Sequence, residues 1–94
     1  MTTHFIVHER ADTVGVMVVE NASANADLTG WIMETDETIT IRSLDPVPLG
    51  HKIALADIHG GDTILKYGQD VGRAVVEIAK GRHVHVHNMK TKRW

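Results

Sequence analysis

Residues 47–52, Val-Pro-Leu-Gly-His-Lys, contain a pattern that occurs three times in this chain. The pattern has six positions: an apolar residue, two residues of any kind, a glycine and then two polar residues. The same order returns at residues 58–63 and 78–83. Glycine has no Cβ, so it accepts the positive φ that a tight turn before a strand often needs. We therefore expect one turn geometry to be reused at Gly50, Gly61 and Gly81.

Short segments rich in β-branched residues lie between and before these turns, and such segments are typical of strands. The expected strands cover residues 5–8, 13–19, 37–42, 51–55, 63–67, 73–76 and 83–87. Two prolines within residues 45–50 exclude regular helix there, and glycine-containing turns are expected at 60–62, 68–72 and 80–81. The pattern predicts a mainly β, compact and contorted fold with at most one or two short helical turns, for example near residues 75–80.

Two segments differ from this pattern. Residues 20–30 are small and polar with no apolar period, which predicts a flexible loop or at most a short helical turn. Residues 90–94 form a basic tail, in which Lys90, Lys92 and Arg93 precede Trp94. Arg and Trp are favoured interface anchors, and a solvated terminus is the alternative interpretation.

Size and composition restrict the possible functions. The 94 residues form one domain (1–94), and a domain of this size buries only about 60–65 % of its unfolded surface, which argues against a self-contained enzyme with a deep cavity. There is no cysteine, the net charge is −2, and no apolar run approaches the roughly 20 residues that span a bilayer. We therefore expect a cytoplasmic protein that binds neither nucleic acid nor membrane.

Residues 82–88, Arg-His-Val-His-Val-His-Asn, place His83, His85 and His87 at two-residue spacing, which puts three imidazoles on one face of an extended strand. Alternate residues of a strand lie about 6.6 Å apart, whereas metal ligands lie about 2.1 Å from their ion. A regular strand can therefore offer at most two of the three to one metal. The His face can also meet a partner subunit, or be a solvated edge with valines packed behind it.

Three phrases in the second half of the chain resemble the SAF domain, a β-clip fold, of the altronate and galactarate dehydratase family. They occur together and in order, at residues 50–55 (Gly-His-Lys-Ile-Ala-Leu), 66–68 (Lys-Tyr-Gly) and 83–88 (His-Val-His-Val-His-Asn). The closest match covers residues 45–89, about half of the chain. Within this family, the chain is most similar to a stand-alone small subunit whose enzyme acts on (2R)-sulfolactate. This similarity rests on the length of the chain, on residues 35–39 and on the ending 90–94.

The resemblance implies a two-component lyase in which a large catalytic subunit supplies most of the active site and most ligands of an iron ion (Fe²⁺). A base removes the proton beside a carboxylate, a group leaves the next carbon, and the enol becomes a 2-keto acid. Sulfite leaves sulfolactate to give pyruvate, whereas water leaves altronate or galactarate. A dehydratase small subunit and a stand-alone metal- or anion-binding module remain alternatives, and the tail also allows a homo-oligomer.

The candidate site residues follow from this chemistry, because imidazole can bind metal or move protons, an ammonium can hold an anion and a phenol can donate to an oxyanion. The catalytic candidates, shared with the partner, are His83, His85, His87, His51, Lys66 and Tyr67. His85 and His87 are the candidate metal ligands. There is no organic-cofactor motif and no cluster of acids at metal spacing, so the carboxylates of an iron site are expected on the partner.

Overall fold

Nine strands make up the computed structural model, which describes residues 2–91, and no helix occurs in that part of the chain. The strands are β1 (Phe5–Val7), β2 (Val14–Met17), β3 (Asp27–Ile32), β4 (Glu37–Arg42), β5 (Lys52–Ala54), β6 (Thr63–Lys66), β7 (Gln69–Ala74), β8 (His83–Val84) and β9 (Met89–Lys90). The mainly β prediction is confirmed. Within these residues no helix could therefore cross a membrane.

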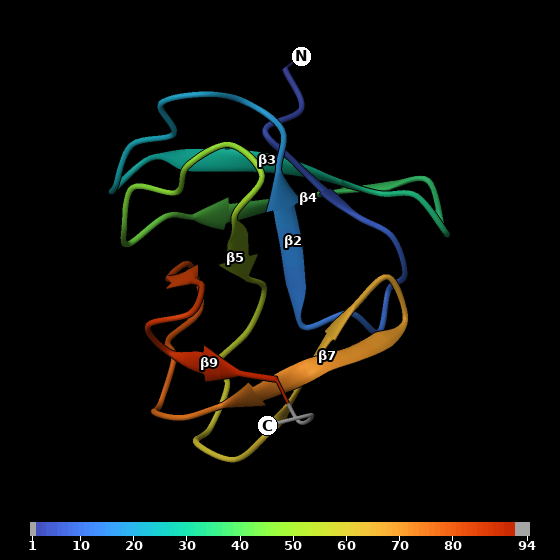
Figure 1. Ribbon diagram of the computed structural model, residues 1–94. Helices are drawn as coiled ribbons and strands as arrows, with labels where there is room; N and C mark the ends of the chain where they lie inside the picture. The colour runs from blue at the N-terminus through green and yellow to red at the C-terminus, as the bar shows by residue number, and fades with distance from the viewer. Residues whose placement is uncertain (1, 92–94) are drawn as a thin grey trace.

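The strands form two sheets. Six strands pair in the order β4-β3-β1-β2-β5-β8, and three pair in the order β6-β7-β9. Among the strands of residues 2–91, β1 and β3 pair in parallel and the other neighbouring strands pair antiparallel. Figure 1 shows β3 and β4 at one end of the molecule and β7 and β9 at the other, with β2 and β5 running between them.

The reused turn is confirmed in all three predicted places. Gly50, Gly61 and Gly81 have φ values of 81°, 92° and 90°, and each leads into a strand. Each turn closes with the same 3.0 Å hydrogen bond, in which the N–H of the residue after glycine donates to the carbonyl three residues earlier. The shared geometry explains why the same pattern of residues recurs.

A fourth copy of the turn corrects the prediction of a loop over residues 20–30. Asn25 takes the left-handed conformation (φ 59°), and β3 begins two residues later at Asp27, so residues 27–30 are strand. Ser43, which is fully buried, accepts a hydrogen bond from the N–H of Ala26 (3.1 Å) and so ties this turn to the end of β4. Asn tolerates positive φ better than most residues, and the missing glycine hid this copy.

The apolar residues that open the four turns pair two by two. Ala22 bridges Val47, and Ile58 bridges Ile78 with hydrogen bonds of 2.8 Å in both directions. All four side chains are buried. The turns therefore pack against one another instead of projecting into solvent as separate loops.

The second half contains two further departures. The strand expected at residues 73–76 is β7 at 69–74, because the turn before it uses only Tyr67 (φ 54°) and Gly68 (φ 70°). Two successive residues with positive φ are typical of a tight hairpin turn. The strand expected at 83–87 ends at Val84, and no helical turn forms at 75–80. Residues 92–94 of the predicted basic tail lie outside the described part.

The core consists of two apolar clusters. One lies under the first sheet and includes Phe5, whose ring fills the space where a side chain on Gly30 would lie. The other joins β5 and β8 to the second sheet through Ala54, Val84 and Ile64, all of them essentially inaccessible to solvent. The strands next to the histidines, β5 and β8, therefore pack on a buried apolar cluster.

Asp12 joins the two sheets. Its buried carboxylate accepts hydrogen bonds from the N–H groups of Glu9 (3.1 Å), Tyr67 (3.0 Å) and Gly68 (2.8 Å). These bonds hold the β6–β7 turn against the connection between β1 and β2. Without the carboxylate, three partly buried N–H groups lose their acceptor.

The substitution Asp12→Ala should lower the free energy of unfolding by about 2–4 kcal/mol, since several partly buried donors become unsatisfied. Urea denaturation followed by circular dichroism measures the change. Asp27→Ala is the matched control: Asp27 pairs with Arg42 at the surface, so its loss should cost less than about 1 kcal/mol. Equally small effects in both variants would contradict the role of Asp12.

Candidate functional site

Three histidines in or directly beside two paired strands lie together. His51 immediately precedes β5, His83 begins β8, and the two strands pair antiparallel with Ile53 opposite His83. The Nδ1 atom of His51 and the Nε2 atom of His83 are 2.8 Å apart. The ring of His85 stacks on that of His51 with centroids 4.0 Å apart. The pairing of β5 and β8 thus adds a histidine from outside the 83–87 segment.

This group has the geometry of a possible metal site. One ring nitrogen from each of His51, His83 and His85 lies within 4.8 Å of the others, and no other group of this kind was found among residues 2–91. Nitrogens bound tetrahedrally to one metal lie about 3.4 Å apart, so modest side-chain rotations would bring the three into range. The Nδ1 atom of His85 is buried without a hydrogen-bond partner. An unsatisfied buried nitrogen and three imidazoles fit a divalent first-row metal.

The structure distributes the predicted histidines differently from a regular strand. Of the two predicted metal ligands, His85 belongs to the group of three, whereas His87 lies outside it with its ring 5.0 Å from that of His83. The limit of two ligands applies to one straight strand. Here the chain turns after Val84, and His51 supplies the third nitrogen from the neighbouring strand.

Asn88 makes that turn, and the sequence reasoning gave it no role. Its side chain accepts a hydrogen bond from the N–H of His85 (3.0 Å) and donates one to the carbonyl of His83 (2.8 Å). The N–H of Asn88 also donates to the carbonyl of His85 (3.1 Å). Asn is a common turn residue because its side chain makes such local bonds, and that tendency is the signal that could have identified it.

Asp45 fixes the start of β8 in a similar way. Its carboxylate accepts the N–H of His83 (3.0 Å) and pairs with the Arg82 guanidinium (2.8 Å). Partial burial by itself would raise the pKa of Asp45, but the hydrogen bond from His83 and the pairing with Arg82 outweigh it and lower the pKa. Asp45 therefore stays ionised and holds the His83 backbone in place.

The surroundings keep two of the histidines neutral. Desolvation, and then the neighbouring His87, His51 and His85, lower the pKa of His83 below its usual value of 6.5. Desolvation is also the largest cause that lowers the pKa of His85, followed by His51, Lys52 and His87. Neutral imidazole is the form that binds metal and accepts a proton, so His83 and His85 are suited to either task near neutral pH.

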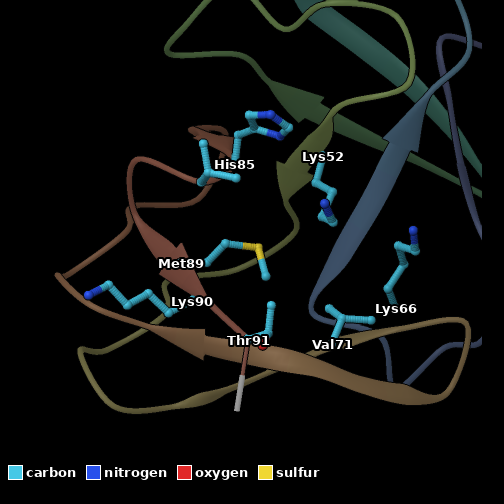
Figure 2. Close-up of a pocket in the computed structure, with 8 residues that line it drawn as sticks. Lys52, Lys66, Val71, His85, Met89, Lys90 and Thr91 are labelled. Atoms are coloured by element: carbon cyan, nitrogen blue, oxygen red, sulfur yellow. The ribbon is translucent and has the colours of Figure 1, made fainter. Parts of the chain in front are cut away.

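A pocket of about 690 Å³ lies beside the cluster, and His85 lines both. Lys52, Lys66 and Val71 line the pocket, and Figure 2 shows the ammonium of Lys90, also a lining residue, pointing away from the other labelled side chains. The remaining lining residues are Val86, Met89 and Thr91. Burial, and then the charge of Lys66, lower the pKa of Lys52. Lys52 is not among the candidates from the sequence, because its proximity to Lys66 depends on tertiary structure.

The other candidate residues divide between this pocket and more distant surfaces. Lys66 lines the pocket, but Tyr67 does not; its ring meets the edge of His8 at 5.2 Å and lies 5.3 Å from the Lys66 ammonium. His59 is exposed and hydrogen-bonded to Glu77, outside the pocket. The structure thus brings together the histidines and Lys66, and places Tyr67 at the margin.

Comparison with known proteins relates the whole chain to one family. The family model of the altronate/galactarate dehydratase SAF domain matches residues 3–92, well beyond the half expected. The chain is 49% identical to (2R)-sulfolactate sulfo-lyase subunit alpha of Chromohalobacter salexigens over the full length of both. It is 52% identical to the subunit of that name from Paracoccus pantotrophus over 48 residues, 51% of this chain and 72% of that protein. Altronate dehydratase of Escherichia coli is 46% identical over 72 residues, 74% of this chain but 14% of that enzyme.

The histidine cluster predicts that acid destabilises the fold. Since the pKa values of His83 and His85 are lowered in the folded state, the unfolded state binds more protons below pH 6.5, and stability falls as the pH drops through that range. The urea midpoint should therefore be lower at about pH 5.5 than at about pH 7.5, and the double substitution His83→Gln/His85→Gln should reduce this difference.

His59→Gln is the control for that experiment. Glu77 raises the pKa of His59, chiefly through their hydrogen bond, so His59 favours the folded state at lower pH, and its removal should steepen the loss of stability on acidification. The lowered carboxyl pKa values of Asp45 and Glu37 act only at more acidic pH. An unchanged pH dependence in the double variant would contradict the assignment to His83 and His85.

Proposed function

The chain belongs to the altronate/galactarate dehydratase SAF-domain family, and we propose that it is the small subunit of a two-component lyase that eliminates sulfite from (2R)-sulfolactate to give pyruvate. The observation that carries this proposal is the 49% identity, over the full length of both chains, to a protein named as subunit alpha of such a lyase. A subunit alpha implies at least one further subunit. The elimination of sulfite is the activity in that relative's name.

The open site supports the need for a partner. The pocket has a volume of about 690 Å³, in the range of sites for drug-sized ligands and larger than a three-carbon acid requires. Val86, one of its lining residues, is 78% exposed, so this wall of the pocket is accessible to a second chain. A large subunit placed here would complete the walls and exclude water.

The residues of this chain suit part of the elimination. The proton on the carbon beside a carboxylate is weakly acidic, so its removal needs stabilisation of the enediolate that forms. His51, His83 and His85 would hold a ferrous ion, which would supply positive charge to stabilise the enediolate. Asp45 and Asn88 keep the His83 and His85 backbone in the geometry that groups these rings. We assign the remaining ligands and the base to the large subunit.

A dehydratase small subunit is the second candidate. The observation that favours it is the 46% identity to altronate dehydratase of Escherichia coli, of which this chain would correspond to a small part. The same site would then release water from a sugar acid. The two candidates differ in leaving group and share the proton abstraction.

The complex with a large subunit should release sulfite and pyruvate from (2R)-sulfolactate, and neither chain should do so alone. Co-expression, purification of the complex and a colorimetric sulfite assay measure this. Altronate and galactarate serve as competing substrates. A purified complex that dehydrates either sugar acid and ignores sulfolactate would contradict the sulfo-lyase proposal and support the alternative.

The metal proposal has its own prediction. Titration of the isolated chain with Fe²⁺ under anaerobic conditions, or with Zn²⁺, should give binding that His51→Ala and His85→Ala each weaken by at least about tenfold, because each removes a ligand. His59→Ala is the matched control, since His59 lies at the surface outside the cluster. A larger loss in His87→Ala than in His51→Ala would favour the ligand pair expected from the straight strand.

A further inference from the structure

Lys52 and Lys66 come from strands of different sheets and share one pocket. Lys52 begins β5 in the first sheet, and Lys66 ends β6 in the second. Both are half-buried, and both line the same pocket. Two like charges held near each other at a partly buried place repel, so the fold tolerates a local cost here.

No salt bridge among residues 2–91 includes either lysine. The pocket lining contains no Asp or Glu, and the ion pairs of this part of the chain use other cations, namely Arg10, Arg42, His59 and Arg82. The whole chain nevertheless has more acidic than basic residues. An unbalanced pair of ammonium groups in a pocket of an acidic protein points to an anionic ligand.

The position next to His85 indicates which anion. His85 belongs to the histidine group and also lines the pocket, so the two regions are contiguous. If the carboxylate and hydroxyl of a three-carbon substrate lie toward the histidines, its other charged end lies toward the lysines. In sulfolactate that end is the sulfonate.

We propose that Lys52 and Lys66 form the subsite for the substrate's sulfonate and for the sulfite that departs from it. This inference rests on the proposed function and adds to it that the small subunit itself binds the leaving group. The apolar floor made by Val71 and Met89 suits the methylene carbon beside the sulfur. The lysines act by charge and hydrogen bonding and form no covalent bond.

The charge change during the reaction gives the pair a catalytic use. The C2–H bond breaks and its proton goes to the base, the electron pair forms the C2=C3 bond, and the C3–S electron pair leaves on sulfur. A sulfonate with one negative charge thereby becomes a sulfite dianion, and the enol of pyruvate takes up a proton at C3 as it tautomerises. Two ammonium groups bind the departing dianion better than the sulfonate, which stabilises the transition state.

Anion titration of the full chain tests the subsite directly. In ¹⁵N-labelled protein, methanesulfonate and sulfite should shift resonances of pocket residues such as Val71 and Met89, and acetate and pyruvate should do so more weakly. Lys66→Met and Lys52→Met should each weaken binding of both sulfur anions by about 10-fold or more, the range for loss of one charged hydrogen bond. Lys80→Met is the matched control, because Lys80 is exposed and outside the pocket.

Kinetics of the complex test binding of the substrate's sulfonate and of the sulfite product separately. Lys66→Met should lower kcat, raise the KM for sulfolactate and weaken product inhibition by sulfite, and Lys66→Arg should restore part of all three. Wild-type values for KM and for sulfite inhibition in Lys66→Met and Lys52→Met would overturn the inference and leave the sulfo-lyase proposal intact. Stronger binding of acetate than of methanesulfonate would also overturn it. If the wild-type complex releases no sulfite, the proposed function fails. If the lysine variants bind methanesulfonate and sulfite as tightly as the wild type, the subsite is refuted whatever the activity of the complex.

Discussion

The pairing of turns is the constraint on which this fold depends. Four turns each use one residue with positive φ, and the apolar residues that open them pair in two isolated bridges, Ala22 with Val47 and Ile58 with Ile78. The bridges give buried backbone groups partners that short strands alone do not provide. They also bury side chains that isolated loops would expose. A chain of short strands thereby acquires two apolar clusters large enough to hold it together.

The same turns position the chemistry. His51 directly follows Gly50, and His83 follows Gly81 by two residues, so two copies of one turn deliver two histidines to the paired ends of β5 and β8. Lys52 begins β5, which the Gly50 turn also introduces, and Lys66 ends β6, which follows the Gly61 turn. Because these side chains stand where strands start or stop, they gather at the rim. The core beneath them is left to Val84, Ala54 and Ile64.

The sequence predicted the elements that local chemistry determines. The turns at Gly50, Gly61 and Gly81 were predicted because glycine marks positive φ, and β4 was predicted from its alternation at residues 37–42. The turn at Asn25 was missed because asparagine marks positive φ less clearly. The His cluster could not be derived from the 83–87 spacing, since it depends on which strand pairs with β8 and on the turn that Asn88 closes. Lys52 and Lys66 likewise come from two different sheets, and no local sequence pattern predicts how those sheets are arranged.

Electrostatics then explains why the site looks incomplete. Desolvation and neighbouring imidazoles hold the pKa values of His83 and His85 low, and adjacent to them Lys52 and Lys66 have no acidic partner in the described pocket. Each feature costs stability in the isolated chain, and such costs tend to be retained at functional sites. A bound dianion would remove the repulsion between the lysines, and a metal would satisfy the buried Nδ1 of His85. If a large subunit closes the pocket, the lower local dielectric strengthens both interactions. The lysine repulsion and the unsatisfied His85 nitrogen, which destabilise the isolated chain, would then favour ligand binding in the complex.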